Sequence, residues 1–354
     1  MVPAANRLGK HPGPTYNAAR MNQRTEATLA FQSLEPDDIL EATESLGFDV
    51  NGRLLALNSY ENRVYRIGVG QRDNRIVKFY RPERWSDAAI LEEHGFATEL
   101  ADAELPVVAP LRIDGSTLHH RGHFRLAAFP NRGGRPPDLD RLDQLEQLGR
   151  LVGQIHNVGA LDAFAARPAI DIDAFGSDSM NYLLDAGWIP VELETAYESV
   201  AEAVLDEVEA AFERVGPTTQ LRLHGDFHPG NVLVDEDRFH LVDLDDARTG
   251  PAIQDLWMFL SGQRSEMEPQ LAALLSGYAA FRDFPSAELG LVEALRSLRI
   301  MHYAAWLARR WDDPAFQQAF PWFAERRYWD EHVLALREQI ALMQEPPLAW
   351  REHS

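Results

Sequence analysis

The hydrophobic periodicity of the chain changes once, and this change divides it into two unlike parts. Residues 53–69 and 75–80, and two short runs around Gly115 and Gly122, are typical of β-strands separated by turns. After residue 142, apolar residues recur at helical spacing, with further helices expected at about 193–214, 266–282, 286–310 and 328–343. Residues 131–137, rich in Gly, Arg and Pro, are typical of a linker between the two parts.

This pattern predicts an α+β protein with two lobes. The first, at residues 30–131, is expected to be a small antiparallel sheet with one substantial helix capped by Ser86. The second, at residues 132–354, is expected to be larger and mainly helical. A cleft between such lobes is where ligands bind. Residues 1–29 are expected to form a flexible N-terminal tail.

Charge and composition exclude several classes of function. Asp and Glu number 55 against 34 Lys and Arg, whereas nucleic-acid and anionic-membrane binding depend on Lys and Arg. No apolar run approaches the roughly 20 residues of a membrane-spanning helix. The chain has no cysteine, which excludes disulfides and a catalytic thiol and fits a reducing cytoplasm. We therefore expect no nucleic-acid partner, no membrane partner and a cytoplasmic location.

Residues 221–246 concentrate His, Asp and Asn in a β-and-loop segment between helices. Asp226 is followed five residues later by Asn231, and a hydrophobic hairpin that turns at residues 235–238 then leads to Asp243. Phosphoryl transfer needs the phosphates, their metal ions and the acceptor hydroxyl held in line. Mg²⁺ takes hard oxygen ligands and one or two carboxylates beside the phosphates. The spacing thus predicts Asn231 and Asp243 as Mg²⁺ ligands and Asp226 as the group that orients the attacking hydroxyl.

Other interpretations of this segment remain open. Asp, Asn, Pro and Gly are also ordinary loop residues, so an isolated Asp-x-x-x-x-Asn would mean little. His224 is expected to brace the loop through backbone hydrogen bonds rather than to transfer protons. A zinc site built from His224, His228 and Asp226 is an alternative by ligand type.

A phosphotransferase also needs a cation on the ATP phosphates, held by a carboxylate from a helix. Lys78 lies in a β-rich run where a buried lysine needs a partner, and the next helix supplies Glu92 and Glu93. We expect Glu93 to be the partner because it shares a helical face with apolar residues, and Glu92 is the alternative. A solvated edge-strand position for Lys78 is a further alternative. Ser59, in the polar turn at 58–63, is a candidate for covering the phosphates.

The loop resembles the catalytic loop of protein kinases, in which an Asp is followed by Asn and a later metal-binding Asp. The variant His-Gly-Asp-x-His-x-x-Asn, here at residues 224–231, is similar to the aminoglycoside-phosphotransferase-like branch of that superfamily. Residues 58–65, 77–85, 90–94, 221–226, 242–248 and 250–258 resemble the bacterial stress response kinase A family, and the similarity extends over about 31–348.

This resemblance implies a two-lobed, protein-kinase-like fold and a cytoplasmic, usually monomeric, Mg²⁺- and ATP-dependent serine/threonine protein kinase that acts in stress response. It implies that Asp226 is the proton acceptor, that Asn231 and Asp243 hold Mg²⁺, and that Ser59 lies at the ATP site. Its partner would be a protein with a Ser or Thr acceptor.

Two other functions are alternatives: a small-molecule kinase of the aminoglycoside, choline or homoserine type, and a nucleotide-binding pseudokinase. Fold alone does not separate them. Asp255 is expected to brace the catalytic loop through backbone amides. Near the C-terminus, aromatic and arginine residues either pack the last helices or line the acceptor site: Trp306, Arg309, Arg310, Trp311, Phe316, Phe320, Trp322 and Phe323.

Overall fold

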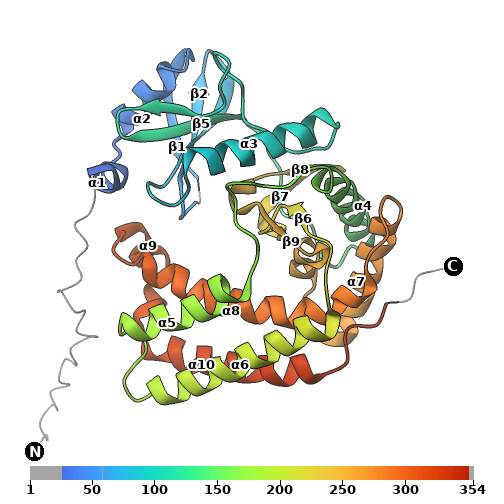
Figure 1. Ribbon diagram of the computed structural model, residues 1–354. Coiled ribbons are helices and arrows are strands. Elements are labelled where there is room, and N and C mark those ends of the chain that lie inside the picture. Colours follow the sequence, from blue (N-terminus) through green and yellow to red (C-terminus); the bar gives the residue numbers. More distant parts are fainter. Residues whose placement is uncertain (1–25, 58, 351–354) are drawn as a thin grey trace, which may run out of the picture.

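The computed structural model describes residues 26–57 and 59–350. The predicted tail lies outside the described residues as far as residue 25, and so does Asn58 of the 58–63 turn. Helix α1 (Glu26–Gln32) begins inside the segment predicted as tail. Figure 1 shows the β-rich part above a larger helical part, which confirms the predicted two-lobed α+β class.

The β-rich lobe is built on one antiparallel sheet with the strand order β1-β2-β3-β5-β4. Its strands and the two helices that accompany them have the following bounds: β1 Val50–Ala56, β2 Arg63–Val69, β3 Asp73–Phe79, β4 His119–Arg121, β5 Phe124–Pro130, α2 Pro36–Glu44 and α3 Asp87–Asp102. The Ser86 side chain accepts a hydrogen bond from the Ala89 amide at 3.2 Å, so the predicted helix cap of α3 is present.

The two faces of this sheet have different partners. Val77 and Phe79 of β3 are fully buried in a core with Phe31 and Ile39 of α1 and α2. Because side chains alternate along a strand, Lys78 points to the opposite face, toward α3. β3 pairs with both β2 and β5, so Lys78 lies in a central strand and the edge-strand alternative is wrong.

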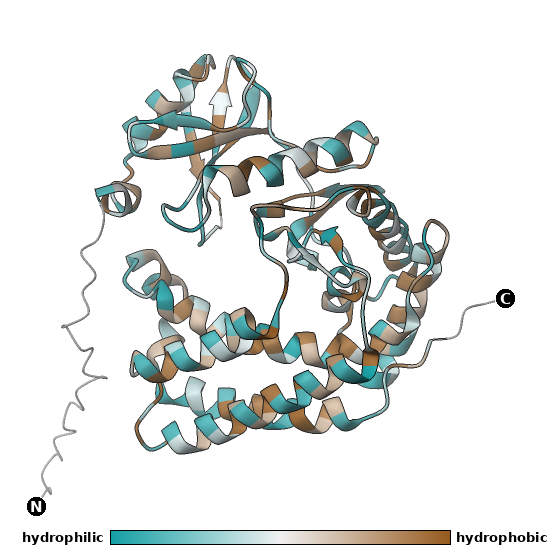
Figure 2. Ribbon diagram, viewed as in Figure 1, coloured by the Kyte–Doolittle hydropathy of each residue, from teal (hydrophilic) through white to brown (hydrophobic). Residues whose placement is uncertain are grey.

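The larger lobe is mainly helical and encloses two small two-stranded sheets, β6–β9 and the β7–β8 hairpin. Its elements are α4 Leu142–Gly159, α5 Asp178–Asp185, α6 Glu194–Val215, β6 Leu221–Leu223, β7 Val232–Asp235, β8 Arg238–Leu241, β9 Arg248–Gly250, α7 Arg264–Ala279, α8 Val292–Arg309, α9 Pro314–Ala319 and α10 Arg326–Gln344. Hydrophobic segments of α6, α8 and α10 (brown in Figure 2) face one another and form a core of their own.

Helices α4 and α7 approach each other closely enough that only glycine fits at their contact. A Cβ on Gly149 would collide with the Leu274 carbonyl, and one on Gly277 would collide with the Glu146 carbonyl. This pair shares a core with the β6–β9 ribbon and with Phe227 of the segment that follows β6. Among residues 26–57 and 59–350, no helix is both long and apolar enough to span a bilayer.

Candidate active site

Asn231 and Asp243 are brought together by the β7–β8 hairpin. Val232 pairs with Leu241, and the Val242 amide donates to the Asn231 carbonyl at 3.0 Å, so the ladder continues to the residue before Asp243. Asp243 itself adopts a left-handed backbone conformation, with φ of 61°. The hairpin thus delivers one amide and one carboxylate side chain to neighbouring positions.

The side chain of Asn231 is oriented by the residue predicted as the base. Its Nδ2 donates to the main-chain oxygen of Asp226 at 2.9 Å, which leaves the Oδ1 of Asn231 available to another partner. The half-exposed carboxylate of Asp243 carries further oxygen donors. One amide oxygen and one carboxylate are the donor types that Mg²⁺ takes beside phosphate oxygens, so this pair fits that ion.

The carboxylate of Asp226 has an arginine and a histidine as neighbours. Arg299 Nη1 donates to its Oδ1, and His228 Nε2 lies 3.5 Å from its Oδ2. Burial raises the pKa of Asp226, but the hydrogen bond from His228 and the positive charge of Arg299 outweigh burial, and the pKa lies below its ordinary value. Asp226 is therefore a carboxylate at neutral pH and can accept a proton.

Asp255 holds the backbone just before Asp226. Its carboxylate accepts hydrogen bonds from the His224 amide at 2.8 Å and from the Gly225 amide at 2.9 Å. Gly225 has a φ of 81°, and a Cβ there would collide with the Asp246 carbonyl, so the turn requires glycine. His156 Nε2 lies 3.3 Å from the same carboxylate. These contacts are the bracing expected of Asp255.

Lys78 is surrounded by three carboxylates. Its Nζ lies 3.0 Å from Asp243, 3.0 Å from Asp245 and 3.8 Å from Glu93. Burial alone would lower the pKa of Lys78, but the three carboxylates raise it well above its ordinary value. Lys78 therefore keeps its charge inside the protein.

The neighbouring glutamates of α3 have different partners. Glu93 is buried and lies beside both Lys78 and Arg167. Glu92 instead accepts hydrogen bonds from the backbone amides of Ala165, Ala166 and Arg167, at 2.8 to 3.0 Å. Glu93 rather than Glu92 is thus the ion-pair partner of Lys78.

A cavity of about 470 Å³ opens onto these groups. Asp226, Asn231, Asp243 and Ser59 all line it, whereas Lys78 does not. Ser59 also borders a smaller cavity of about 330 Å³ beside α9. These catalytic candidates therefore share one cavity, and Lys78, outside its lining, contacts Asp243.

The zinc alternative does not agree with the geometry. His224 Nε2 lies 3.0 Å from the Val242 carbonyl and its backbone amide donates to Asp255, so it braces the loop. His228 alone lies beside Asp226. Within residues 26–57 and 59–350, no group of three or more His, Asp or Glu side chains is arranged to hold a metal ion.

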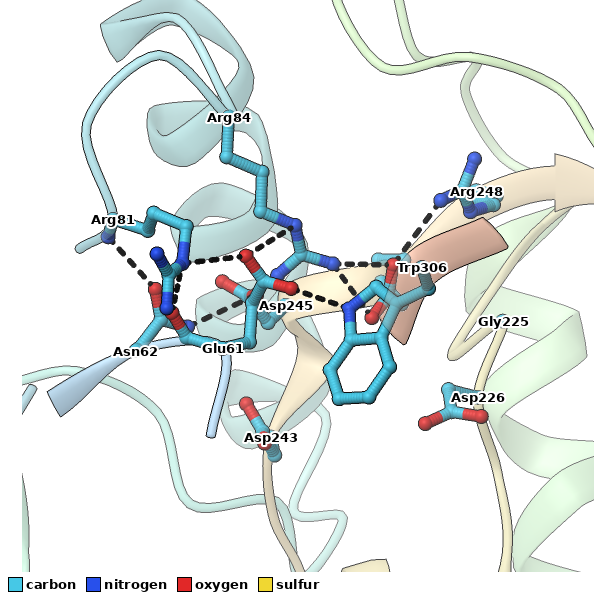
Figure 3. Close-up of polar contacts among 12 residues, drawn as sticks. Glu61, Asn62, Arg81, Arg84, Gly225, Asp226, Asp243, Asp245, Arg248 and Trp306 are labelled. Atoms are coloured by element: carbon cyan, nitrogen blue, oxygen red, sulfur yellow. Dashed lines mark hydrogen bonds and ion pairs between the residues drawn. The ribbon is translucent and has the colours of Figure 1, made fainter. Parts of the chain in front are cut away.

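A polar network that the sequence did not predict joins the two lobes at the cavity (Figure 3). Asp245 accepts hydrogen bonds from Asn62 at 3.0 Å and from Arg84, and Arg84 also forms two 2.8 Å hydrogen bonds to Asp246. Burial raises the pKa of Asp245 and Asp246, and the neighbouring cations lower it further than burial raises it. These pairs hold the segment after β3 against the segment after Asp243.

Glu61 extends this network to helix α8. Its Oε2 lies 2.5 Å from both Trp306 Nε1 and Arg310 Nε, and its Oε1 lies 3.2 Å from Arg81 Nε, as Figure 3 shows for Trp306 and Arg81. The turn that bears Ser59 is therefore held against the helical lobe. In the sequence, the acidic residues that follow Asp243 are the local feature that points to these contacts.

A second link between the lobes lies beside Glu61. Asp313 accepts hydrogen bonds from Arg63 at 2.8 Å and from Arg81 at 2.9 Å. Tyr60 packs edge-on against Phe320, with ring centroids 4.8 Å apart.

The C-terminal aromatic group is divided between the core and the cavity lining. Phe316 and Phe323 are fully buried and pack the last helices, whereas Trp306 lines the cavity. Trp306 also stacks on Tyr303, with an interplanar angle of 18°. Part of this group therefore packs the core, as predicted, and part forms a wall of the cavity, whose use as an acceptor site stays a prediction.

Comparison with known proteins agrees with this geometry. Residues 53–290 match the phosphotransferase enzyme family. The chain is 44% identical over 322 residues to stress response kinase A of Escherichia coli O157:H7, covering 91% of this chain and 97% of that protein. It is 43% identical over 320 residues to the serine/threonine protein kinase RdoA of Salmonella typhimurium, covering 90% and 97% of the two chains.

Solved structures show the same fold at low sequence identity. The amicoumacin kinase hAmiN, solved with AMP-PNP, Ca²⁺ and Ami, has a TM-score of 0.68 at 16% identity and covers 88% of this chain and 95% of its own. A microcompartment-associated aminopropanol kinase has a TM-score of 0.65 at 19% identity and covers 87% and 97%. The chain therefore belongs to the phosphotransferase enzyme family and, within it, to the stress response kinases A.

Proposed function

We propose that this phosphotransferase moves the γ-phosphoryl group of ATP to a serine or threonine hydroxyl of a protein, with Mg²⁺ as the metal. The observation that carries the proposal is the juxtaposition of Asn231 and Asp243 at the end of one hairpin, with the Asn231 amide bonded to the backbone of Asp226. Two oxygen donors and one ionised carboxylate in one cavity are the groups that in-line phosphoryl transfer requires.

Each residue has a distinct role in this proposal. Asp226 accepts the hydrogen bond of the attacking hydroxyl, orients it and takes its proton as the new bond forms. Asn231 and Asp243 would hold Mg²⁺, which neutralises phosphate charge when bound. Lys78, kept charged by Asp243, Asp245 and Glu93, would reach the phosphates once ATP competes for it with Asp243. Ser59, in the turn above the cavity, would contact the phosphates from the β-rich lobe.

The protein acceptor is supported by the relative that is named a serine/threonine protein kinase, and the role in stress response by the names of the other relatives. We further propose that the enzyme acts as a monomer in the cytoplasm, where ATP is available and where a chain without cysteine loses no stabilising disulfide.

A small alcohol is the second candidate acceptor. The cavity beside Asp226 holds about 470 Å³ and has an aromatic wall, which falls in the size range of small-molecule sites. The structural neighbours named above are an amicoumacin kinase and an aminopropanol kinase.

One experiment separates the two acceptors. The purified protein is incubated with labelled ATP and Mg²⁺, either with dephosphorylated casein or with a panel of amino alcohols that includes choline, homoserine and aminopropanol. Transfer to seryl or threonyl residues of casein supports the protein-kinase proposal. Transfer to the small alcohols alone would refute it, and no transfer to any acceptor with no ATP hydrolysis would refute phosphotransfer itself.

A further inference from the structure

The catalytic loop contains no lysine or arginine of its own. Between Asp226 and Asn231 the chain reads Phe-His-Pro-Gly. During phosphoryl transfer, negative charge is spread over the three equatorial oxygens of the moving group, and cations beside the metal ions stabilise it. A cation for this purpose must therefore come from elsewhere in the fold.

Most cationic side chains near the cavity form ion pairs with carboxylates other than Asp226. Lys78 is held by Glu93, Asp243 and Asp245. Arg84 and Arg248 are both bound to Asp246. None of these three side chains contacts the catalytic carboxylate, so none is positioned beside the point at which the acceptor oxygen attacks.

Arg299 is the cation that lies beside the Asp226 carboxylate. Its Nη1 donates to Asp226 Oδ1, and its side chain is 41% exposed and lines the cavity. Within residues 26–57 and 59–350, this is the one hydrogen bond that the guanidinium group makes. A guanidinium has five N–H donors in a planar fork, so the others are available to a ligand in the cavity.

Helix α8 holds this side chain at a fixed place. Arg299 lies between Leu295 and Leu298, which are almost fully buried, and His302 and Tyr303, which share its face of the helix and also line the cavity. A residue on a packed helix keeps its position more strictly than one on a loop. The helix therefore presents a cation to Asp226 without rearrangement of the backbone.

We propose that Arg299 is a catalytic residue that neutralises the phosphoryl group during its transfer to the acceptor. In the free enzyme Arg299 pairs with Asp226. When the acceptor hydroxyl takes its place at Asp226, the guanidinium turns its donors to the phosphoryl oxygens. This inference rests on the proposed phosphotransfer function, and it holds for a protein or a small alcohol as acceptor.

The reaction moves one phosphoryl group to the acceptor and one proton to Asp226. The acceptor oxygen forms a bond to the γ-phosphorus while the bond from that phosphorus to the β,γ-bridging oxygen breaks. The bridging oxygen leaves with the electron pair as part of ADP, and the hydroxyl proton passes to the Asp226 carboxylate. Arg299 exchanges no proton or electron, since guanidinium stays charged at any physiological pH. The contribution of Arg299 is electrostatic, and it is greatest when the phosphoryl group lies between the acceptor oxygen and the β,γ-bridging oxygen.

The test compares a ground-state analogue with a transition-state analogue. Calorimetry measures the Kd of AMP-PNP and the Kd of ADP with aluminium fluoride, both with Mg²⁺, for the wild type and for Arg299→Gln and Arg299→Lys. We expect Arg299→Gln to bind AMP-PNP within about twofold of the wild type and to bind the fluoride complex at least about tenfold more weakly. Arg299→Lys keeps the charge without the planar fork of N–H donors, so its Kd for the fluoride complex should lie between those of the wild type and Arg299→Gln.

Turnover gives a second readout and a control. We expect Arg299→Gln to lose at least about 100-fold in kcat with little change in the KM for ATP. Arg309→Gln is the matched control, because Arg309 is exposed at the end of the same helix and donates to the Asp178 carbonyl outside the cavity. It should match the wild type in both measurements.

Three results would overturn the inference. Arg299→Gln that binds both analogues and turns over like the wild type would show that the cation is not needed. An equal loss for both analogues would show a structural role, and a higher kcat would show that Arg299 blocks the base. If the wild type itself neither transfers phosphate nor gains affinity from aluminium fluoride, the proposed function fails and the inference falls with it.

Discussion

The side-chain amide of Asn231 donates to the main-chain oxygen of Asp226 across 2.9 Å, and this bond joins the proposed metal ligand to the proposed base. The bond fixes which end of the amide faces the cavity, since the nitrogen is used and the oxygen is not. The proposed metal ligand and the proposed base therefore share one short loop.

The first prediction concerns this bond. Asn231→Ala removes both the bond to Asp226 and the amide oxygen offered to Mg²⁺, so we expect turnover to fall at least about 100-fold and half-maximal activity to require more Mg²⁺. Initial rates across a Mg²⁺ titration measure both effects. Asn157→Ala is the control, because Asn157 bonds only at an exposed site to Phe281 and Arg282. Unchanged Mg²⁺ dependence in Asn231→Ala would contradict the assignment.

The second prediction uses two adjacent glutamates with different partners. Glu93→Gln removes a charge beside Lys78, so we expect the Kd for ATP to rise by about tenfold. Glu92→Gln changes a residue that caps three backbone amides, so it should reduce thermal stability with little effect on ATP binding. Calorimetry and thermal unfolding of the pair provide the check. The reverse pattern would mean that Glu92 serves the nucleotide.

The third prediction concerns the brace of the catalytic loop. Asp255→Ala leaves the amides of His224 and Gly225 buried without their acceptor. We expect the free energy of unfolding to fall by about 3 kcal/mol or more, with loss of activity. Urea denaturation measures this change, and Asp206→Ala on the exposed side of α6 is the control. A loss below about 0.5 kcal/mol would show that the loop does not need the brace.

The fourth prediction concerns pH and stability. Glu288 is 1% exposed and accepts a hydrogen bond from the Ile253 amide, and burial raises its pKa from 4.5 to about 7. The folded state therefore binds this proton more tightly than the unfolded state. The stability that the group contributes is complete below pH 4.5 and is lost as pH rises through 7.

Glu288→Gln cannot lose a proton, so its stability relative to the wild type should increase between pH 5 and pH 8, by up to roughly 3 kcal/mol. Urea denaturation at both pH values measures the difference. Glu202→Gln, at an exposed position of α6, should follow the wild-type curve. If the free energy of unfolding of Glu288→Gln changes with pH in the same way as that of the wild type, the raised pKa of Glu288 would be refuted.

Much of the fold and of the catalytic loop was predictable because the signals are local in sequence. The Asp226-to-Asn231 spacing and the β7–β8 hairpin need only turn chemistry and alternation, and the structure forms that hairpin at the predicted turn. Strand alternation and helical spacing were likewise enough to place Lys78 opposite Glu93 rather than Glu92. The roles of these residues in binding ATP and Mg²⁺ stay predictions.

The contacts that enclose the cavity were not predictable because they join residues far apart in the chain. Arg299 is 73 residues from Asp226, and Glu61 is 245 residues from Trp306. No local pattern specifies which arginine of an amphipathic helix faces a distant carboxylate. The start of α1 at Glu26 was missed for a related reason, since a short helix is stabilised by packing rather than by propensity.

The most direct test of the account is the rate of phosphoryl transfer by Asp226→Asn, which keeps the shape of the side chain and removes its basicity. Single-turnover transfer from labelled ATP, with calorimetry of ATP binding on the same sample, measures chemistry and binding separately. We expect a rate lower by about 1,000-fold and a Kd for ATP within about threefold of the wild type. Transfer within about fivefold of the wild-type rate would contradict it.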